Sequence, residues 1–464
     1  MNFQELEELL ARTDILDASY PVKGTFVWLP TGVKLKENVF GMIKGKVDEL
    51  GYEQYQFPRL MPGEALRIVS KHIQNFEEKV FWLRKGDQPL DTFLSPTGEC
   101  GIYPMFKQWI RTHADLPLRV YQIGNTFRSH KHSYALINAD ESGPLLEAHA
   151  AFATKREAEE EFDVVVDLLK DVHEELGIPY RAVIRPKWGN NPVAEKNVSF
   201  ETYFPPKKVN LNQGVAYLQG QIFSKAFGIK FVTKEGFHEH THQLTFGINE
   251  RVLAAMLSLH ADQYGLQLLP KFSPMQVVIV PIYTGEEDSK VREYSEYIGK
   301  QLNGIRVYID DSSKYLPRKK FPIWREKGVP IRIGISLEDV KNQTARVYRR
   351  DRKDPETLSS LELNQKIPQY LNEITSYIYN QASKIFEEKI VHASSYSDIS
   401  RLVGEYNIVR FEWCGIDKCG IKIEEGSVGE ILGSALDEMP KGECINCGNK
   451  ASVVAYFAKR AYSP

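Results

Sequence analysis

Hydrophobic and polar residues alternate with helical spacing in two long stretches of the first 270 residues. LKENVFGMIKGKVDELG (35–51) and KREAEEEFDVVVDLLKDVHEELG (155–177) carry apolar residues at intervals of three and four, and each ends at a glycine that suits a helix C-terminus. Between them, YEQYQFPRL alternates as a strand does and meets Pro58. This part of the chain is therefore expected to mix helices and strands.

The pattern changes near residue 270. The apolar run MQVVIVPIY (275–283) predicts a buried strand, and an acidic helix (285–303) follows it. Next come a strand IRVYID, a basic loop, and strands VPIRIGI and RVYRRD, and this alternation predicts a small α/β unit. Residues 362–390 look helical and lead to a last unit. We divide the chain into 1–270, 271–375 and 376–464.

Length and charge narrow the possible functions. The 464 residues are too many for one hydrophobic core, which agrees with several domains. Lysine and arginine (59) nearly balance aspartate and glutamate (61), so a nucleic-acid partner would need a local basic patch. The apolar run at 275–283 is too short to cross a membrane, and the start is an acidic amphipathic helix rather than a targeting peptide. We expect a cytoplasmic protein without a membrane partner.

Four of the five cysteines form two close pairs near the C-terminus, Cys414 with Cys419 and Cys444 with Cys447. Two pairs of this kind can surround one tetrahedral Zn²⁺, and Gly448 would allow the tight turn after the second pair. Four unrelated thiols or two disulfides are the alternatives, and disulfides fit poorly with a cytoplasmic chain. The spacing predicts a structural zinc site in which protein ligands fill every position.

Common nucleotide-binding and hydrolase motifs are absent from the sequence: it has no GxxxxGK[ST], GxGxxG, HExxH or GxSxG. If the protein uses ATP, arginines would have to hold it. Arg128 ends an alternating strand in VYQIGNTFRSH, and Arg251 stands beside Glu250 at a strand-to-helix turn. A cation at a helix start opposes the helix dipole and calls for an anionic partner, although a structural salt bridge would also explain it.

A loop in LSPTGECGIYPMFKQWI (94–110) places Thr97 and Glu99 before an aromatic-rich helix. A hydroxyl and a carboxylate beside an apolar pocket would suit the ammonium group of a small substrate. A helix-capping turn is the simpler interpretation.

Three histidines alternate in FHEHTHQ, so that His238, His240 and His242 would share one face of a strand. A metal site is one interpretation of this pattern. An exposed sheet edge is the other, and we favour it.

Basic and aromatic residues are interleaved in KYLPRKKFPIWREK and RVYRRDRKD, near Phe321, Trp324 and Tyr348. This combination suits phosphate contact and base stacking on single-stranded RNA. A solvated lysine-rich loop would look the same in the sequence.

Taken together, these segments resemble the prolyl-tRNA synthetases of the archaeal and eukaryotic type, which carry a C-terminal zinc domain. The resemblance covers nearly the whole chain and rests on the order and spacing of several segments. They are SPTGECGIYPMFKQWIRTHADLPLRVYQIGNTFR, LLEAHAAFAT, QGQIFSKAFGIKF, QVVIVPIY, REKGVPIRI and the cysteine module with its YFAKRAY tail.

The resemblance implies a class II aminoacyl-tRNA synthetase. Its fold would be an α+β catalytic domain with an antiparallel six-stranded sheet, an α/β anticodon-binding domain and a small C-terminal zinc-binding α+β domain. It implies motif 1 at Pro58, motif 2 at Arg128 and motif 3 at Arg251. The partners would be tRNA, a small amino acid and a second copy of the chain, in a homodimer.

Site residues are carried over position by position. ATP would be bound by Arg128, Gln221 and Arg251, with the two arginines as the catalytic pair. The amino acid would be bound by Thr97, Glu99, Arg128, His149 and Tyr217. The anticodon would meet Lys320, Arg325 and Arg332. The implied reaction is adenylation of an amino acid with ATP and Mg²⁺, followed by transfer to tRNA, and it needs positioning and cations rather than a protein nucleophile.

Three regions depart from the family pattern. FRSH replaces FRYE, which puts His130 where a glutamate helps to hold adenine, and the following arginine-rich loop has Tyr134, Asn138 and Asp140 instead. GTSHYLGQ becomes GVAYLQGQ, with Val215, Ala216 and Tyr217 in the pocket. In the anticodon-type domain, Arg325 and Gly334 replace carboxylates, which suggests another anticodon or weaker anticodon reading.

These departures leave alternatives to a proline–tRNA ligase. If Tyr217 projects into the pocket, a smaller amino acid such as alanine would fit better, for a non-standard tRNA. The chain could also pass an activated amino acid to an acceptor other than tRNA, although a basic anticodon-type domain argues against this. A non-catalytic relative is opposed by Arg128, Arg251, Thr97 and Glu99.

Overall fold

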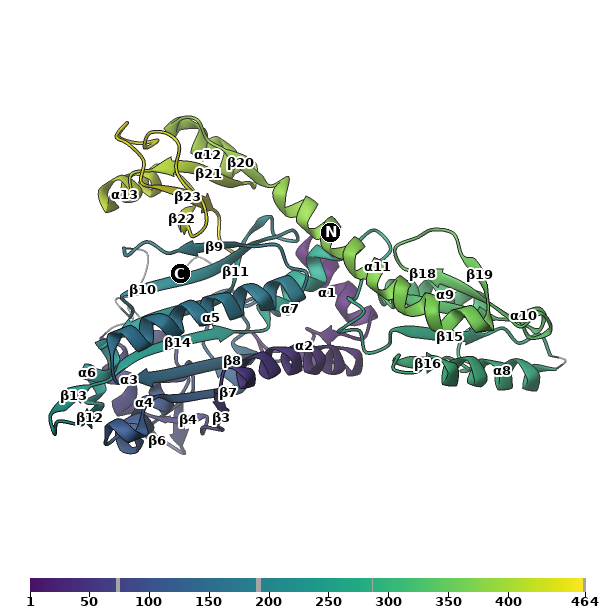
Figure 1. Ribbon diagram of the computed structural model, residues 1–464, viewed down its shortest axis with the longest axis horizontal. Coiled ribbons are helices and arrows are strands. Elements are labelled where there is room, and N and C mark those ends of the chain that lie inside the picture. The colour runs from purple at the N-terminus through teal and green to yellow at the C-terminus, as the bar shows by residue number, and fades with distance from the viewer. Residues whose placement is uncertain (72–75, 189–192, 286, 462–464) are drawn as a thin grey trace.

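The computed structural model describes residues 1–71, 76–188, 193–285 and 287–461 (Figure 1). A large sheet with its helices forms one end of an elongated molecule, a smaller α/β unit forms the other, and helix α11 (Ser360–Glu387) runs between them. The helix expected over 285–303 includes residue 286, and the C-terminal unit and its YFAKRAY tail include residues beyond 461. These positions lie outside the described residues.

The central sheet has eleven strands within the described residues. From one edge to the other they are β3 (Glu53–Gln54), β7 (Leu118–Phe127), β8 (Glu141–Phe152), β14 (His242–Ile248), β11 (Val209–Gly220), β10 (Lys196–Phe204), β9 (Arg181–Ile184), β22 (Glu430–Ala435), β23 (Val453–Ala458), β21 (Ile408–Trp413) and β20 (Ile390–His392). The strands from β7 to β21 are antiparallel to their neighbours, and both edge strands are parallel to theirs.

This sheet is longer than the six-stranded sheet that the resemblance implied. Strands β7 to β9 match the expected antiparallel set, but β22 of the C-terminal unit pairs with β9 through Ser434 opposite Ile184 and Ala435 opposite Val183. The C-terminal unit is therefore joined to the catalytic sheet by strand pairing. Backbone hydrogen bonds across β9 and β22 leave no open sheet edge between the two units.

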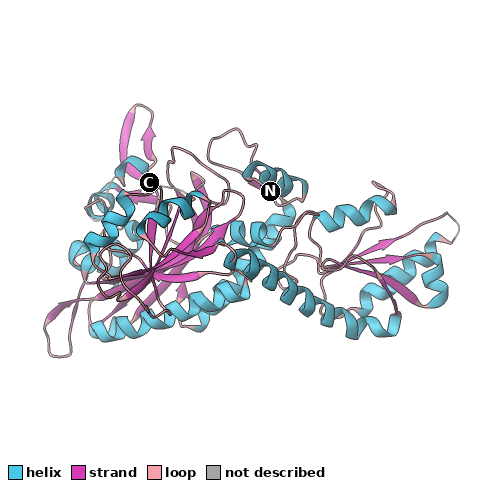
Figure 2. Ribbon diagram, turned by 90° about the horizontal axis from the view of Figure 1, so that it is seen from above, coloured by secondary structure: helices cyan, strands magenta, loops and turns pink. Residues whose placement is uncertain are grey.

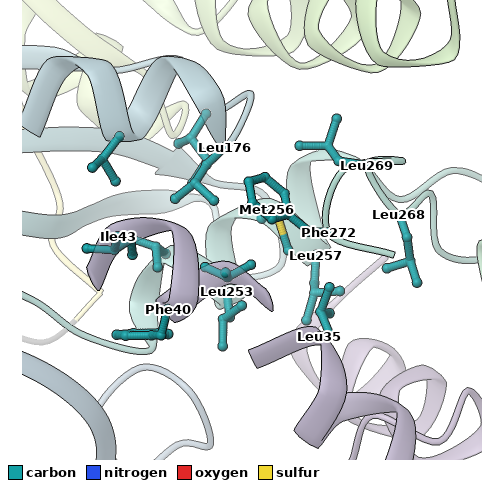
Figure 3. Packing of buried hydrophobic residues seen from close by; sticks show 14 of the residues in the cluster. Leu35, Phe40, Ile43, Leu176, Leu253, Met256, Leu257, Leu268, Leu269 and Phe272 are labelled. Carbon is teal, nitrogen blue, oxygen red and sulfur yellow. The ribbon is translucent and has the colours of Figure 1, made fainter. Parts of the chain in front are cut away.

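Helices α1 (Phe3–Arg12), α2 (Pro30–Glu49), α5 (Lys155–Glu175) and α7 (Arg251–Leu259) supply the core of the first unit (Figure 2). Figure 3 shows α2 and α7 side chains meeting, among them Ile43 and Leu253, both fully buried. Each such side chain contributes about 1.5–3 kcal/mol by leaving water. The helix predicted over 155–177 is confirmed, and a capping box between Thr154 and Glu157 starts it.

The helix expected from residue 35 begins earlier, because Pro30 occupies its first turn, where a missing N–H costs nothing. The strand expected in YEQYQFPRL is interrupted. Only Glu53–Gln54 pairs with β7, and a second strand begins at Leu60, because Pro58 between them cannot donate to a ladder.

Smaller elements complete the first unit. They are the pair β1 (Leu16–Asp17) and β2 (Val27–Trp28), the sheet β4 (Leu60–Pro62), β6 (Gln88–Leu94) and β5 (Trp82–Lys85), helices α3 (Gly63–Val69), α4 (Glu99–Trp109) and α6 (Ile222–Phe227), the pair β12 (Lys230–Val232) and β13 (His238–His240), and 3-10 turns at Glu77–Lys79 and His113–Asp115.

The second unit is the predicted α/β unit. Its sheet order is β16 (Val307–Ile309), β15 (Val277–Pro281), β17 (Ile331–Ile335), β18 (Thr344–Arg349) and β19 (Glu356–Ser359), and its helices are α8 (Asp288–Gln301), α9 (Pro317–Glu326), α10 (Leu337–Asn342) and α11. Strands β15, β16 and β17 run parallel. The helical stretch expected over 362–390 is confirmed as α11.

Residues 317–326 form helix α9, whereas the sequence analysis predicted a basic loop here. Pro317 takes the first helical position, and the turn of Lys320 and Trp324 faces inward, with both side chains buried. The basic residues hid this amphipathic pattern, since the buried face includes a lysine. None of the helices in the described part of the chain combines the length and apolarity that crossing a membrane requires.

The last unit contains α12 (Tyr396–Gly404) and α13 (Asp417–Glu425) beside strands β20 to β23. A buried ion pair ties it to the first unit, because Arg460 Nη1 lies 3.1 Å from Glu201 Oε1 in β10. Both side chains are almost fully buried. Sheet pairing and this ion pair together fix the C-terminal unit against β9 and β10.

Candidate active site

One face of the central sheet carries polar side chains in register. His149 of β8 lies opposite Thr245 of β14, which lies opposite Tyr217 of β11. Directly opposed residues of antiparallel strands point to the same face, so these three form a row. Glu147 is two positions from His149 in β8 and shares that face, whereas Ala148 faces the hydrophobic core.

The loop before α4 brings Thr97 and Glu99 over this row. Thr97 Oγ1 donates to the Glu99 carboxylate and lies 3.1 Å from Glu147 Oε1. Residue 98, between them, packs closely against Glu147 and has room only for glycine, because a Cβ there would lie 2.5 Å from Glu147 Oε2. The N-cap of α4 is Gly98, without a side-chain capping bond, so a simple capping turn does not explain Thr97.

The two carboxylates of this cluster ionise differently. Burial and the charge of Glu147 raise the pKa of Glu99. Burial also raises the pKa of Glu147, but contacts with His149, the Gly98 N–H and the Thr97 hydroxyl together outweigh this effect, and the pKa of Glu147 is lowered. Glu147 Oε2 is buried and has no hydrogen-bond partner among the described residues. An incoming ammonium group would supply the missing donor.

His149 is fully buried, and polar groups lie next to both of its ring nitrogens. Its Nδ1 lies 3.1 Å from the Tyr103 hydroxyl, which donates to Gln219 Oε1. Its Nε2 lies 3.6 Å from Glu147 Oε1 and 3.4 Å from Thr245 Oγ1, and Thr245 donates to Ala148 O. These contacts hold the imidazole ring beside Glu147 in one orientation.

Arg128 follows the last residue of β7 and reaches the same cluster. Its Nε donates to the Pro96 carbonyl at 2.7 Å, which ties the arginine to the Thr97 loop. Burial lowers the pKa of Arg128, Glu147 partly offsets this, and the charge of Arg251 lowers it further. The two guanidinium groups are thus close enough to disfavour each other, and a polyphosphate would compensate both.

Arg251 is the first residue of α7, where its charge opposes the helix dipole. Its Nε donates to the Ile137 carbonyl at 2.6 Å, in the loop that follows Arg128. The two arginines predicted from distant sequence segments therefore lie at the same end of the sheet.

Tyr217 is half-buried and belongs to the row of Thr245 and His149, so it projects toward the cluster, as the pocket argument required. Gln221, also expected in the pocket, donates from Nε2 to the His240 carbonyl at 2.9 Å and lies 3.2 Å from His242 Nε2. The structure therefore gives Gln221 a role in holding the start of β14, and its contact with ATP stays a prediction.

The substituted loop after Arg128 is folded onto its surroundings. Tyr134 packs edge-on against Phe3 of α1, with ring centroids 5.3 Å apart. Asn138 is buried and donates to the His132 carbonyl at 2.7 Å, and Asp140 Oδ1 accepts from the His130 N–H at 3.1 Å. The residues that replace family arginines are therefore used to fold the loop.

The four C-terminal cysteines converge as their spacing predicted. Their sulfur atoms all lie within 4.8 Å of one another, and Cys447 and Cys414 are 3.9 Å apart. Tetrahedral Zn²⁺ bonds of about 2.3 Å to sulfur require separations close to this. Burial raises the pKa of Cys444, but backbone N–H groups outweigh it and lower the pKa to about 7, which favours the metal-binding thiolate.

The turn after the second cysteine pair needs glycine. Gly448 has a φ of 73°, in the left-handed region. The four thiols, which form no disulfide in the structure, thus fit a zinc ion.

Two of the three residues expected at the anticodon are buried. Lys320 is 3% exposed, with its ammonium 3.0 Å from Asp310 Oδ1 and 2.7 Å from the Asp310 carbonyl. Arg332 donates to the Phe321 carbonyl at 3.1 Å, and burial lowers its pKa to about 10. Arg325 is half-buried over the ring of Tyr264. Lys320 is thus better explained as a structural residue than as an RNA contact.

The three alternating histidines do not converge. The metal-competent groups found among the described residues are the cysteine cluster and Glu99 with Glu147 and His149. His240 Nδ1 lies near the carbonyls of Ser224 and Ile229, and His238 is exposed on β13. The sheet-edge interpretation is the one that the structure supports.

Sequence reasoning missed Glu147, Tyr103 and Gln219. Glu147 could have been recognised, because LLEAHAAF carries a glutamate and a histidine two positions apart in an otherwise apolar strand. Tyr103 and Gln219 could not be predicted from the sequence, because their contact joins α4 to β11 across more than a hundred residues.

Three family models match the chain in order. They are the tRNA synthetase class II core domain (G, H, P, S and T) over residues 81–260, the anticodon binding domain over 276–370, and the C-terminal domain of prolyl-tRNA synthetase over 396–462.

Full-length relatives agree with these models. The proline–tRNA ligase of Methanopyrus kandleri is 39% identical over 460 residues, covering 97% of this chain and 94% of that protein. That of Pyrococcus abyssi is 36% identical, covering 99% and 98%. The prolyl-tRNA synthetase of Cryptosporidium parvum complexed with halofuginone and AMPPNP superposes with a TM-score of 0.91 at 27% identity, covering 99% of this chain and 97% of that one. The same enzyme with L-proline and AMP gives 0.90 at 26%, covering 98% and 94%.

Proposed function

Because the chain belongs to the prolyl-tRNA synthetase family, we propose that it activates proline with ATP and transfers it to tRNA. The observation that carries this proposal is the cluster of Thr97, Glu99 and Glu147. The carboxylates of Glu99 and Glu147 lie together beside His149, and Glu147 Oε2 has no hydrogen-bond donor among the described residues. A secondary ammonium, with two N–H donors and one positive charge, matches this deficit.

Each residue of the site has a role in this proposal. Glu99, Thr97 and Glu147 hold the ammonium, His149 fixes the orientation of Glu147, and Tyr217 forms a wall beside the pyrrolidine ring. A carboxylate oxygen of proline attacks the α-phosphorus of ATP, and pyrophosphate leaves. No protein nucleophile is required, because in-line positioning and charge compensation lower the barrier.

The phosphates are assigned to the arginine pair. Arg128 would bind the α-phosphate beside the substrate carboxylate, Arg251 would bind the γ-phosphate, and Gln221 is retained as a further ATP contact. Mg²⁺ bound to ATP would neutralise part of the phosphate charge. The closeness of the two guanidinium groups supports this assignment. Their positive charges repel each other, and an anion bound between them would offset that repulsion.

Transfer requires tRNA, and we propose that residues 271–375 bind its anticodon through a surface that includes Arg325, with 1–270 as the catalytic domain and 376–464 as the zinc domain. A tRNA substrate places the activity in the cytoplasm. Two of the alternatives, a smaller amino acid such as alanine or an acceptor other than tRNA, are not favoured, because relatives of full length are proline–tRNA ligases and all three family models are present.

Two further parts of the proposal concern the assembly. The converged thiols would hold one structural Zn²⁺ per chain, which elemental analysis of the purified protein would detect. Two chains would form a homodimer, which sedimentation equilibrium would measure as twice the mass of 53.1 kDa. Zinc near zero with all four thiols titratable would contradict the first, and a monomer at micromolar concentration the second.

The central test is pyrophosphate exchange with each of the standard amino acids, followed by aminoacylation of a proline tRNA transcript. Exchange should depend on proline, and the transcript should accept it. Exchange that is stronger with alanine than with proline would overturn the proposed substrate.

A further inference from the structure

Lysine side chains gather at the end of the central sheet where β10 ends and β11 begins. The turn between these strands contains Lys207 and Lys208, and Lys459 follows β23. The N–H of Asn210 donates to the Lys459 carbonyl at 2.7 Å, which holds the C-terminal segment beside the turn. We define the lysine patch as these three lysines and the two tyrosines that they surround: Lys207, Lys208, Lys459, Tyr134 and Tyr406.

Both tyrosine rings are covered by ammonium groups. Tyr406 is 43% exposed, and the Nζ atoms of Lys208 and Lys459 lie 5.3 Å and 5.0 Å from its ring centroid. Lys207 lies over the ring of Tyr134. The backbone of Tyr406 has a φ of 63°, in the left-handed region that a large side chain rarely adopts. The three lysines come from two segments distant in sequence.

The positive charge of the patch is only weakly compensated. Glu405, next to Tyr406 in the chain, forms an ion pair with Arg401, in which Glu405 Oε1 lies 3.3 Å from Arg401 Nη1. Burial lowers the pKa of Lys207 to about 8, and Glu7 offsets only part of this effect. Lys208, Tyr406 and Lys459 lie together along the seam between the C-terminal unit and the sheet. Cations gathered in one place on a surface attract an anionic partner.

The patch adjoins the loop in which Tyr134, Asn138 and Asp140 stand at positions that are arginines in the family pattern. Tyr134 belongs both to that loop and to the patch, and its ring is enclosed by Phe3 and Lys207. Asn138 is buried and Asp140 is used within the loop, so neither position presents a cation to a partner. Lys207, Lys208 and Lys459 therefore add cations beside these positions from neighbouring segments.

We propose that the lysine patch binds the phosphate backbone of the tRNA acceptor arm, with the exposed ring of Tyr406 available to stack on an unpaired nucleotide. Lysines interleaved with aromatic rings suit RNA backbone and single-stranded bases. The patch lies at the end of the sheet that carries Arg128 and Arg251, where the 3′ end must arrive. Figure 1 shows the central sheet and the anticodon-binding unit as separate parts of the molecule, so a bound tRNA must contact both. This inference rests on the proposed function.

The test replaces Lys208 and Lys459 with glutamate, singly and together, in the full chain. The matched control is Lys234→Glu, because Lys234 is an exposed lysine in the turn between β12 and β13, beyond the other end of β14. Filter binding of a proline tRNA transcript is measured from about 50 to 200 mM salt. Each patch variant should weaken binding roughly threefold to tenfold and reduce the salt slope by about one, whereas the control should do neither.

Proline-dependent pyrophosphate exchange without tRNA separates the two proposals. Exchange in the patch variants should match the unmodified enzyme while the KM for tRNA rises. Equal tRNA affinity and salt slope in Lys208→Glu and Lys234→Glu would overturn the patch, even if exchange with proline is normal. Tyr406→Asn suits the left-handed backbone and should keep the fold while weakening tRNA binding. If Lys459→Glu does not fold, Lys208→Glu and Tyr406→Asn decide the question.

Discussion

Two buried charge clusters in this chain have opposite characters. In the catalytic unit, Glu99 and Glu147 lie beside a single histidine, His149, and Glu147 Oε2 lacks a partner among the described residues. In the anticodon-binding unit, Asp310 meets the ammonium of Lys320 at 3.0 Å and the indole N–H of Trp324 at 2.8 Å. The first cluster leaves one carboxylate oxygen without a partner among the described residues, and in the second both carboxylate oxygens of Asp310 have donors.

The difference separates a binding site from a structural contact. A buried charge with incomplete partners costs free energy that a ligand of the opposite charge can recover. A buried pair with complete partners has nothing to recover, and its loss affects only the fold. Sequence resemblance assigned both Glu99 and Lys320 to binding, and the partners of each side chain distinguish them.

The largest expected effect comes from breaking the cluster around Asp310. Lys320→Met leaves the Asp310 carboxylate buried without a cation, which should lower the free energy of unfolding by about 3–5 kcal/mol. Denaturant unfolding followed by circular dichroism would measure it. Lys319→Met, one residue away and exposed, should change stability by less than about 0.5 kcal/mol. If Lys320→Met is as stable as the control but loses tRNA affinity, the lysine is a binding residue after all.

The next effect concerns the arginine pair of the charged site. Arg128→Ala removes a guanidinium group from the proposed phosphate site and should slow proline-dependent pyrophosphate exchange by about 2–4 kcal/mol in activation free energy. Stability should change little, because a half-buried cation with a lowered pKa is not favoured in the free enzyme. Arg156→Ala on the exposed side of α5 is the control. Near-normal exchange by Arg128→Ala would remove Arg128 from the active site.

Part of the fold and of the candidate site was predictable from the sequence. The helices over 155–177 and 362–390 were predictable because their periodic apolar residues face a core, and the cysteines were predictable because zinc geometry dictates their spacing. Thr97 and Glu99 were found through a local loop that a short sequence can encode.

Other features depend on register and distant packing. The pairing of β22 with β9 joins residues about 250 positions apart, and neither strand signals its partner. Helix α9 was missed because Lys320 faces inward, against the usual exposure of lysine. The partners of His149 come from β14 and α4, so the charge of the site could not be counted before the strands were aligned.

A smaller effect tests the charge balance of the site through pH. Glu99 must be ionised to hold an ammonium, and burial and Glu147 raise its pKa, so the KM for proline should rise as the pH falls through that value. Glu147→Gln removes a negative charge next to Glu99 and lowers the pKa of Glu99, which moves this rise to lower pH. The KM on the high-pH plateau should increase about tenfold, because one ammonium partner is lost.

Steady-state exchange across pH measures both shifts. Glu141→Gln, at the start of the same strand and hydrogen-bonded to Asn125, is the matched control. A pH profile that does not move in Glu147→Gln would show that the two carboxylates do not interact, and the comparison of the two clusters would lose its basis.

The smallest expected effect concerns the shape of the site. Tyr217 stands in the row of Thr245 and His149, on the face that carries the charged cluster, so its ring limits the space beside the bound amino acid. Trimming it in Tyr217→His should open room for the pyrrolidine ring and raise the ratio of kcat/KM for proline over alanine. The change should stay within about 1–3 kcal/mol, because a contact of this kind discriminates by size alone.

Unmodified enzyme should already favour proline, since the ammonium site rather than the wall supplies most of the binding. If alanine and proline are activated equally and Tyr217→His restores proline preference, the wall decides specificity and the smaller amino acid is the substrate of this chain.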